Sequence, residues 1–357
     1  MSQYWRVSES GSRAGDVLAG PRGRELCACL ATGMTVSEIE LRLVPWSADG
    51  LPGAGPADPL ATASLFRQQF RALEPGLGDQ LGAVAALAEV SERASYWGEP
   101  SPAVPLDHSA VVTELRAVAM RLAESGGCQW WWSPLDRSAQ RDVQWTAREG
   151  QAPAFGTAAG ALRSAAEEAD EQERRMGRDR HKPAGSGVGG PWWSHPFPGL
   201  ISTTRRLGSL GAVLLAGQED GFGDREAVVW PLAVAGSARV FEIDGPEAWQ
   251  RLVATYPRAA TGTYRHTWAW TGWDGEWLMP RWTAVADDWD GVHLSVAGYL
   301  ATAGRALPVG TARTLLGGWN PDETYWLTDV LTPDGQAQAW HNDSGAPLGW
   351  TARRDIR

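Results

Sequence analysis

The sequence predicts an α+β protein in which a helix-rich N-terminal part precedes a part of mixed helices and strands. Apolar residues recur mainly at helical spacing in residues 1–176, whereas residues 191–357 carry short strand-like patterns between short helices. A polar and then glycine-rich stretch at 177–190 divides the two parts and is predicted to be a linker or a mobile loop. At 357 residues the chain is long enough for two such units with a substantial core.

The N-terminal part begins with a short predicted strand at 4–8, which carries Arg6. A stretch rich in Gly, Pro and Asp at 46–59 is predicted to be a loop. Asp107 is the candidate N-cap of the predicted helix at 109–125. Three successive tryptophans within 128–133 favour a strand that is buried on both faces. The predicted helices are 24–30, 61–73, 80–96, 109–125 and 158–175, and the remaining predicted strands are 39–43 and 141–146.

The C-terminal part contains the stretch most indicative of a site. Leu200 and Ile201 lead directly into three hydroxyl residues and an arginine, which predicts a buried strand whose last residues face a polar pocket. Pro246 suits the first turn of a helix. The predicted strands are 200–204, 212–215, 238–244, 292–296 and 324–329, the last of them closing the core, and the predicted helices are 246–256 and 282–289.

Composition limits the classes of partner. The net charge is −10 and Lys182 is the only lysine, so bulk nucleic-acid binding is not expected, although a local arginine cluster can hold one phosphorylated ligand. The 21 tryptophans suit core packing and stacking on planar ligands, and we expect most of them to lie in the core. The preference for arginine over lysine is typical of a genome of high GC content, such as an actinobacterial one.

Cysteine usage and hydropathy indicate the compartment. Cys27, Cys29 and Cys128 form neither a disulfide framework nor a paired metal motif. No apolar run approaches membrane-spanning length, and the N-terminus lacks a signal pattern. We therefore expect a cytoplasmic protein without a metal ion or a membrane partner. Among the scattered histidines, His293 and Asp290 are close enough along the chain to form an acid–base pair across a turn, although a lone strand histidine is more often a satisfied core group.

Three features in chain order carry a resemblance to a known family. Arg6 lies on the first predicted strand, Ser202-Thr203-Thr204 on a later one, and Asp288-Trp289-Asp290 just before a third. This order resembles the arginine, Ser-Thr-Ser and Glu-x-Glu signature of the ADP-ribosyltransferase toxin superfamily. The segments 201–205 and 240–244 are similar to a hydroxyl-rich strand and an aromatic-Glu-Ile strand of its pierisin-like members.

The resemblance covers about residues 192–296 together with Arg6, and it implies a mixed-sheet catalytic half that uses NAD as substrate. Breaking the nicotinamide–ribose bond builds positive charge on the sugar, which a neighbouring carboxylate stabilises. The resemblance assigns this role to Asp290 or Asp288, and it assigns orientation of the carboxylate or the ribose to Ser202.

The resemblance also implies the residues that bind NAD. Arg6 would hold a diphosphate oxygen through its planar fork, Trp193 would stack on nicotinamide, and Thr203 and Arg205 would complete the site. The sequence departs from the signature because aspartate replaces glutamate and because residues 7–201 separate Arg6 from Ser202. Either a large helical unit is inserted there, or an arginine at 205–206 takes the place of Arg6.

The predicted function is therefore ADP-ribosyl transfer from NAD to an unknown acceptor, or NAD glycohydrolysis. Two alternatives remain open. The first is a non-enzymatic binding or scaffold protein with a tryptophan-rich recognition surface. The second is a tailoring enzyme of specialised metabolism on a related fold that acts on another small molecule.

Overall fold

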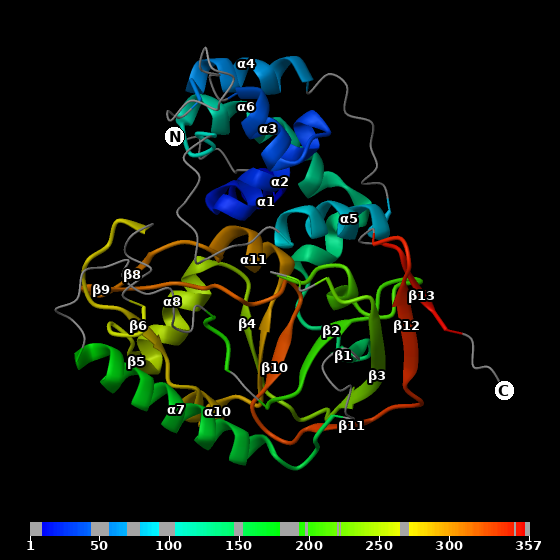
Figure 1. The fold of residues 1–357 in the computed structure, drawn as a ribbon, viewed down its shortest axis with the longest axis vertical. Helices are drawn as coiled ribbons and strands as arrows, with labels where there is room; N and C mark the ends of the chain where they lie inside the picture. The colour runs from blue at the N-terminus through cyan, green and yellow to red at the C-terminus, as the bar shows by residue number, and fades with distance from the viewer. Residues whose placement is uncertain are drawn as a thin grey trace, which may run out of the picture.

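The structure is a computed structural model of the 357-residue chain, and it describes residues 9–43, 57–69, 79–92, 104–145, 153–178, 193–196, 199–219, 221, 223–264, 271–345 and 348–353. Within them the protein is α+β, as predicted, with helices grouped at one end of a mixed sheet (Figure 1).

The sheet has the strand order β13-β12-β3-β1-β2-β10-β7-β4, and β11 pairs with β3. Its strands are β1 (Gln140–Trp145), β2 (Ser202–Arg205), β3 (Glu226–Val234), β4 (Val240–Ile243), β7 (Gly291–Leu294), β10 (Thr324–Trp326), β11 (Leu331–Pro333), β12 (Gln338–Asn342) and β13 (Trp350–Ala352). Only the β4–β7 pair is parallel, and the other pairs of the sheet are antiparallel. Two short hairpins, β5 (Pro257–Ala259) with β6 (Leu278–Pro280) and β8 (Leu307–Val309) with β9 (Ala312–Thr314), lie beside it.

The helical layer packs on the end of the sheet through α11 (Val296–Thr302), which α1 and α2 contact. It consists of α1 (Glu9–Ala19), α2 (Pro21–Thr32), α3 (Val36–Leu43), α4 (Pro59–Gln69), α5 (Gln80–Ser91), α6 (Ser109–Glu124) and a 3-10 helix, η2 (Gly126–Trp132). A β-carbon at Gly20 would lie 2.0 Å from the Leu300 carbonyl oxygen, so only glycine permits this close approach.

One hydrophobic core runs through both parts of the chain. It includes Leu115 of α6, Val292 of β7 and Trp340 of β12. Strand β1 precedes residues 177–190 in the chain, yet it lies between β3 and β2. The sheet therefore takes strands from both sides of the glycine-rich stretch.

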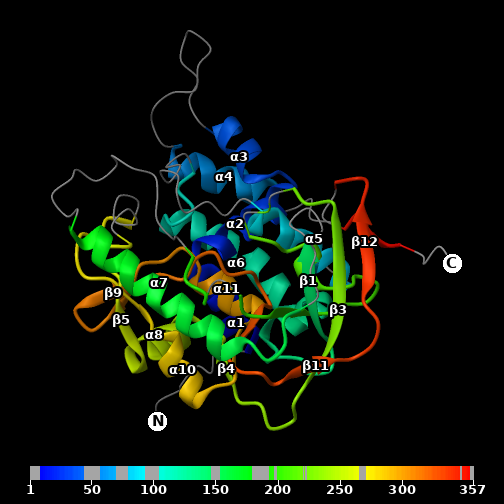
Figure 2. The same cartoon turned by 60° about the horizontal axis from the view of Figure 1, so that its bottom comes forward.

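Three further helices lie beside the sheet: α7 (Ala158–Arg178), α8 (Pro246–Thr255) and α10 (Trp282–Asp288). Helix α7 contacts α10 and runs along the outside of the molecule (Figure 2). It begins at the predicted residue, and its charged half mixes exposed residues, such as Glu171 and Arg174, with Glu173, which accepts from Gly262 and Thr263. Pro246 occupies the first turn of α8, as predicted.

Several predicted elements are wrong in type. The predicted strand at 39–43 belongs to α3, because Thr35 and Glu38 form a reciprocal capping box that starts a helix. The predicted strand at 128–133 is the 3-10 helix η2, and the predicted strand at 212–215 contains another, η4 (Val213–Leu215). In a 3-10 helix successive side chains point in different directions, so Trp130 and Trp131 meet edge to face at 87°.

Two predictions about the ends of elements are also wrong. Helix α6 is capped by His108, whose ring accepts from the Ala110 N–H, and not by Asp107. Strand β10 is not the last strand of the core, since β12 and β13 follow it and join the sheet. The strand predicted at 4–8, and with it Arg6, falls outside the described residues, as does most of the loop predicted at 46–59. No helix in the described ranges is both long and apolar enough to cross a membrane.

Candidate functional site

The predicted site residues Thr203 and Arg205 lie on β2, which pairs with β1 and β10. Arg205 donates from Nε to Asp322 Oδ1 at 2.6 Å, and its backbone N–H donates to Asp322 Oδ2 at 2.9 Å. Asp322 directly precedes Glu323 and β10, and has a φ of 64°, in the left-handed region that aspartate tolerates better than most residues. The Arg205 guanidinium also lies over the Trp130 ring, 5.1 Å from its centroid.

His293 on β7 continues this series of charges. Its Nδ1 lies 2.5 Å from Glu242 Oε2, and its Nε2 lies 3.5 Å from Asp322 Oδ1. The parallel pairing of β4 with β7 sets Glu242 opposite His293. Burial alone would lower the pKa of His293, but hydrogen bonds and charges from Asp322 and Glu242 raise it to about 9. His293 is therefore a buried core histidine held by Glu242 and Asp322, the commoner of the two expectations, and it does not pair with Asp290.

We call Arg205, Asp322, His293 and Glu242 the ionic row. Its two positive and two negative charges balance, and only Glu242, whose side chain is 31% exposed, reaches solvent. The side chains of Arg205 and Asp322 are 7% and 2% exposed. Arg205 is thus committed to an internal ion pair, whereas the resemblance implies that it holds a diphosphate.

Ser202 and Thr203 are also occupied within the sheet. The Thr203 hydroxyl donates to Gln140 Oε1 at 2.5 Å and accepts from Trp326 Nε1 at 2.8 Å. Ser202 forms a hydrogen bond with the Glu323 carboxyl. Burial raises the pKa of Glu323 to about 7, although hydrogen bonds from Ser202 and Asn320 oppose the rise.

A cavity of about 240 Å³ lies between α7 and the C-terminal part, and we call it the α7 cavity. Its α7 wall presents the apolar residues Leu162, Ala165, Ala166 and Ala169. Its other walls carry the aromatic side chains of Trp193, Tyr264 and Trp282. A cavity lined by apolar and aromatic residues suits a planar ligand.

Polar groups line the rest of the α7 cavity. Arg258 and Arg281 supply guanidinium groups, and Glu168 and Gln172 project from α7. His195 stacks on Tyr325 with ring centroids 4.6 Å apart and planes 8° apart. Burial lowers the pKa of His195 to about 4 despite the opposing contact with the Pro196 carbonyl, so the ring is neutral at pH 7.

Hydrogen bonds fix the walls of the α7 cavity. The Tyr264 hydroxyl donates to the Trp193 carbonyl at 2.6 Å, and Ser194 exchanges hydrogen bonds with the backbone of Gly317. Glu173 of α7 accepts from the N–H of Gly262 at 2.7 Å and from both the N–H and the hydroxyl of Thr263. These contacts tie the loops on both sides of the cavity to the body of the protein.

The predicted site residues are thus distributed over three places. Trp193 lines the α7 cavity. Ser202 is connected to the cavity indirectly, because Glu323 forms hydrogen bonds with both Ser202 and Tyr325, and the cavity residue His195 stacks on Tyr325. Thr203 and Arg205 lie within the sheet.

The third location of predicted site residues holds Asp290 and Asp288. Asp290 accepts from the Arg239 N–H at 2.7 Å and from the Thr328 hydroxyl at 2.8 Å, at the end of β10 opposite Asp322. Asp288 accepts from the Tyr256 hydroxyl at 2.6 Å. Among the described residues neither carboxylate has a hydrogen bond to the hydroxyl-rich strand, although Asp290 lies across the end of β10 from Ile201, since their carbonyls accept from the neighbouring N–H groups of Leu327 and Trp326.

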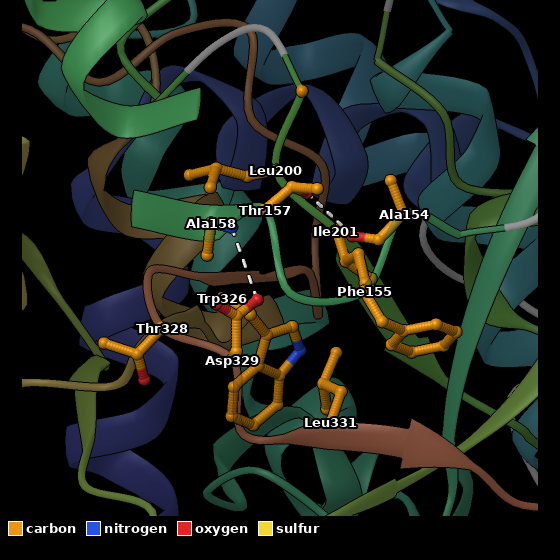
Figure 3. A pocket seen from close by; sticks show the side chains of 11 residues that line it. Ala154, Phe155, Thr157, Ala158, Leu200, Ile201, Trp326, Thr328, Asp329 and Leu331 are labelled. Carbon is orange, nitrogen blue, oxygen red and sulfur yellow. Dashed lines mark hydrogen bonds between the residues drawn. The ribbon is translucent and has the colours of Figure 1, made fainter. Parts of the chain in front are cut away.

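A second hollow of about 10 Å³ lies at the start of α7, where the Ala158 N–H donates to Asp329 Oδ1 at 3.3 Å (Figure 3). Phe155, Trp326 and Leu331 surround it. A space of this size is at the lower limit for one water molecule and does not admit a ligand.

Within the described part of the chain, no group of three or more histidine, cysteine or acidic side chains is arranged to hold a metal ion. Comparison with known proteins adds no relative: no protein-family model, no curated protein and no solved structure matches this chain.

Proposed function

We propose that the α7 cavity binds NAD and that the protein cleaves its nicotinamide–ribose bond, transferring ADP-ribose to an acceptor or to water. The observation that carries the proposal is the cavity itself, whose lining combines apolar residues of α7, three aromatic residues and two arginines. An aromatic heterocycle joined to a diphosphate offers the complementary features. Trp193 keeps the stacking role that the family resemblance gives it.

The reaction requires a carboxylate near the ribose. The bond from the nicotinamide nitrogen to ribose C1 breaks, its electron pair leaves with nicotinamide, and C1 develops positive charge before an oxygen nucleophile adds to it and loses a proton. Glu168 is the carboxylate that lines the α7 cavity, within 3.3 Å of Gln172 Nε2. Since Asp288 and Asp290 are held by other groups, we assign this role to Glu168.

A scaffold function has less support. It requires a contiguous exposed patch of indole rings, but every tryptophan in the described ranges is buried or half-buried. A planar anionic substrate other than NAD fits the same cavity, and that alternative corresponds to the tailoring enzyme.

The test replaces Glu168 with glutamine and measures nicotinamide release together with NAD affinity from tryptophan fluorescence. We expect Glu168→Gln to reduce release by about 100-fold or more and to leave affinity within about threefold. Glu167→Gln is the matched control, because Glu167 is the neighbouring glutamate of α7, is exposed like Glu168, and does not line the cavity. Absence of NAD binding at millimolar concentrations, or unchanged release by Glu168→Gln, would overturn the proposal.

A further inference from the structure

Backbone hydrogen bonds fix the position of Arg281 beside the α7 cavity. Its backbone N–H donates to the Tyr256 carbonyl at 2.7 Å, and its own carbonyl accepts from the N–H groups of Ala284 and Val285 at the start of α10. The side chain extends from this fixed point into the cavity lining and is 45% exposed. An anion in the cavity can therefore approach the guanidinium without a change in the backbone.

A carboxylate of α7 already faces this guanidinium. Asp170 Oδ2 lies 3.8 Å from Arg281 Nη1, and the Asp170 side chain is 41% exposed. Asp170 directly follows Ala169, which lines the cavity wall. Asp170 does not itself line the cavity, so the ion pair joins α7 to Arg281 at the edge of the cavity.

The pair is too long and too exposed to be strong. Exposed ion pairs contribute little because water screens them, whereas a phosphate can accept two parallel N–H bonds from one guanidinium. A phosphate group that enters the cavity would therefore displace Asp170 from Arg281.

We propose that Arg281 is the anion-binding residue of the α7 cavity and that Asp170 is an internal competitor, which holds Arg281 until a ligand phosphate replaces it. This inference rests on the proposed cavity as the ligand site, but it does not require the ligand to be NAD. It names the ligand class as a planar molecule with a phosphate or diphosphate group. The competition lowers ligand affinity by the strength of the Asp170–Arg281 pair, which is about fivefold at most.

The experiment measures the affinities of inorganic pyrophosphate, NAD and nicotinamide for three variants by fluorescence titration and thermal shift. Asp170→Asn is expected to raise pyrophosphate and NAD affinity about threefold to fivefold. Arg281→Gln is expected to lower both by about tenfold or more. In the double variant the gain from Asp170→Asn should disappear, because its target is gone. Nicotinamide has no phosphate, so neither substitution should change its binding.

The controls separate competition from a general charge effect. Glu167→Gln removes a charge elsewhere on α7 and should leave pyrophosphate affinity unchanged. If Asp170→Asn has no effect, or if its gain persists in the Arg281→Gln background, the competition is refuted even when NAD binds and is cleaved. If pyrophosphate binding depends on Arg281 and Asp170 while NAD does not bind, the proposed reaction fails and this inference stands. If none of the three probes binds, both proposals fall.

Discussion

The ionic row and the α7 cavity each contain an arginine opposite an aspartate, and the two pairs behave differently. Arg205 and Asp322 are 2.6 Å apart with side chains 7% and 2% exposed, whereas Arg281 and Asp170 are 3.8 Å apart with side chains 45% and 41% exposed. The first pair is closed to solvent and completed by His293. The second pair is open and weak.

The difference in burial between the two pairs indicates which arginine can bind a ligand. A buried charge has lost its hydration and depends on its partner, so separating the pair leaves an uncompensated charge in the interior. An exposed guanidinium keeps water as an alternative partner and can change partners at little cost. The sheet arginine is therefore part of the fold, while the cavity arginine is available for binding.

The largest expected effect comes from replacing each arginine with alanine. Arg205→Ala leaves Asp322 and Glu242 with one positive partner between them and should lower the free energy of unfolding by about 3–5 kcal/mol. Arg281→Ala should lower it by less than about 1 kcal/mol. Urea denaturation followed by circular dichroism measures both. Equal losses in the two variants would remove the distinction between a structural and an available arginine.

The next effect is the pH dependence of stability, which we assign to His293. Glu242 from β4 and Asp322 before β10 face its ring, and they raise its pKa in the folded protein to about 9, against about 6.5 in the unfolded chain. A raised pKa means that the stabilisation is fully present below about pH 6.5 and is lost as pH rises through 9.

The free energy of unfolding should therefore fall by about 3 kcal/mol between about pH 6.5 and 9.5, as the size of the pKa shift of His293 implies. The melting temperature should fall over the same range of pH. Asp322 acts in the opposite direction: burial favours its neutral form, but His293 and Arg205 lower its pKa, so its contribution is lost as pH falls through the acid range. His293→Gln is the control for the alkaline limb. If that variant shows the same alkaline loss as the wild-type protein, another group causes it.

The sequence predicts the type of many elements but misses others, such as α1, α11 and the long strand β3, and the errors of type have local causes. Long periodic helices such as α6 and α7 follow from apolar spacing, and β1 and β7 follow from alternation. The alternating letters of 39–43 also fit a strand, but the Thr35–Glu38 capping box favours the helix, and that signal is readable in the sequence. Three tryptophans in a row give no period, so the 3-10 turn of η2 could not be inferred.

The candidate site is less predictable because it depends on register and on distant segments. Glu242 lies within a strand that the sequence predicts, yet its partner His293 is 51 residues away and is set by the parallel β4–β7 register. Among the predicted site residues that the structure describes, Trp193 is the one that lines the α7 cavity. Arg258 and Arg281 have no local pattern that separates them from other surface arginines, so only the packing of α7 against the hairpin and α10 identifies them.

The smallest expected change in the free energy of unfolding comes from the two aspartates that the sequence predicts as catalytic. Asp290 binds the Arg239 N–H and the Thr328 hydroxyl, and these hydrogen bonds lower its pKa although burial opposes them. Asp290→Asn should therefore destabilise the protein by about 1–2 kcal/mol, since a neutral amide replaces a charged acceptor. Asp288→Asn alters one exposed contact, with the Tyr256 hydroxyl, and should cost less than about 0.5 kcal/mol.

Neither aspartate variant should change nicotinamide release per folded molecule, because the carboxylate proposed for that step is Glu168 in the α7 cavity. Release by Asp290→Asn is measured at a temperature well below its melting point, so that loss of fold does not imitate loss of chemistry. If release falls by 100-fold or more in the folded Asp290→Asn protein, the catalytic carboxylate lies at the Asp290 end of β10. The α7 cavity would then hold at most the part of NAD remote from the ribose, and Arg281 would bind a phosphate far from the reacting bond.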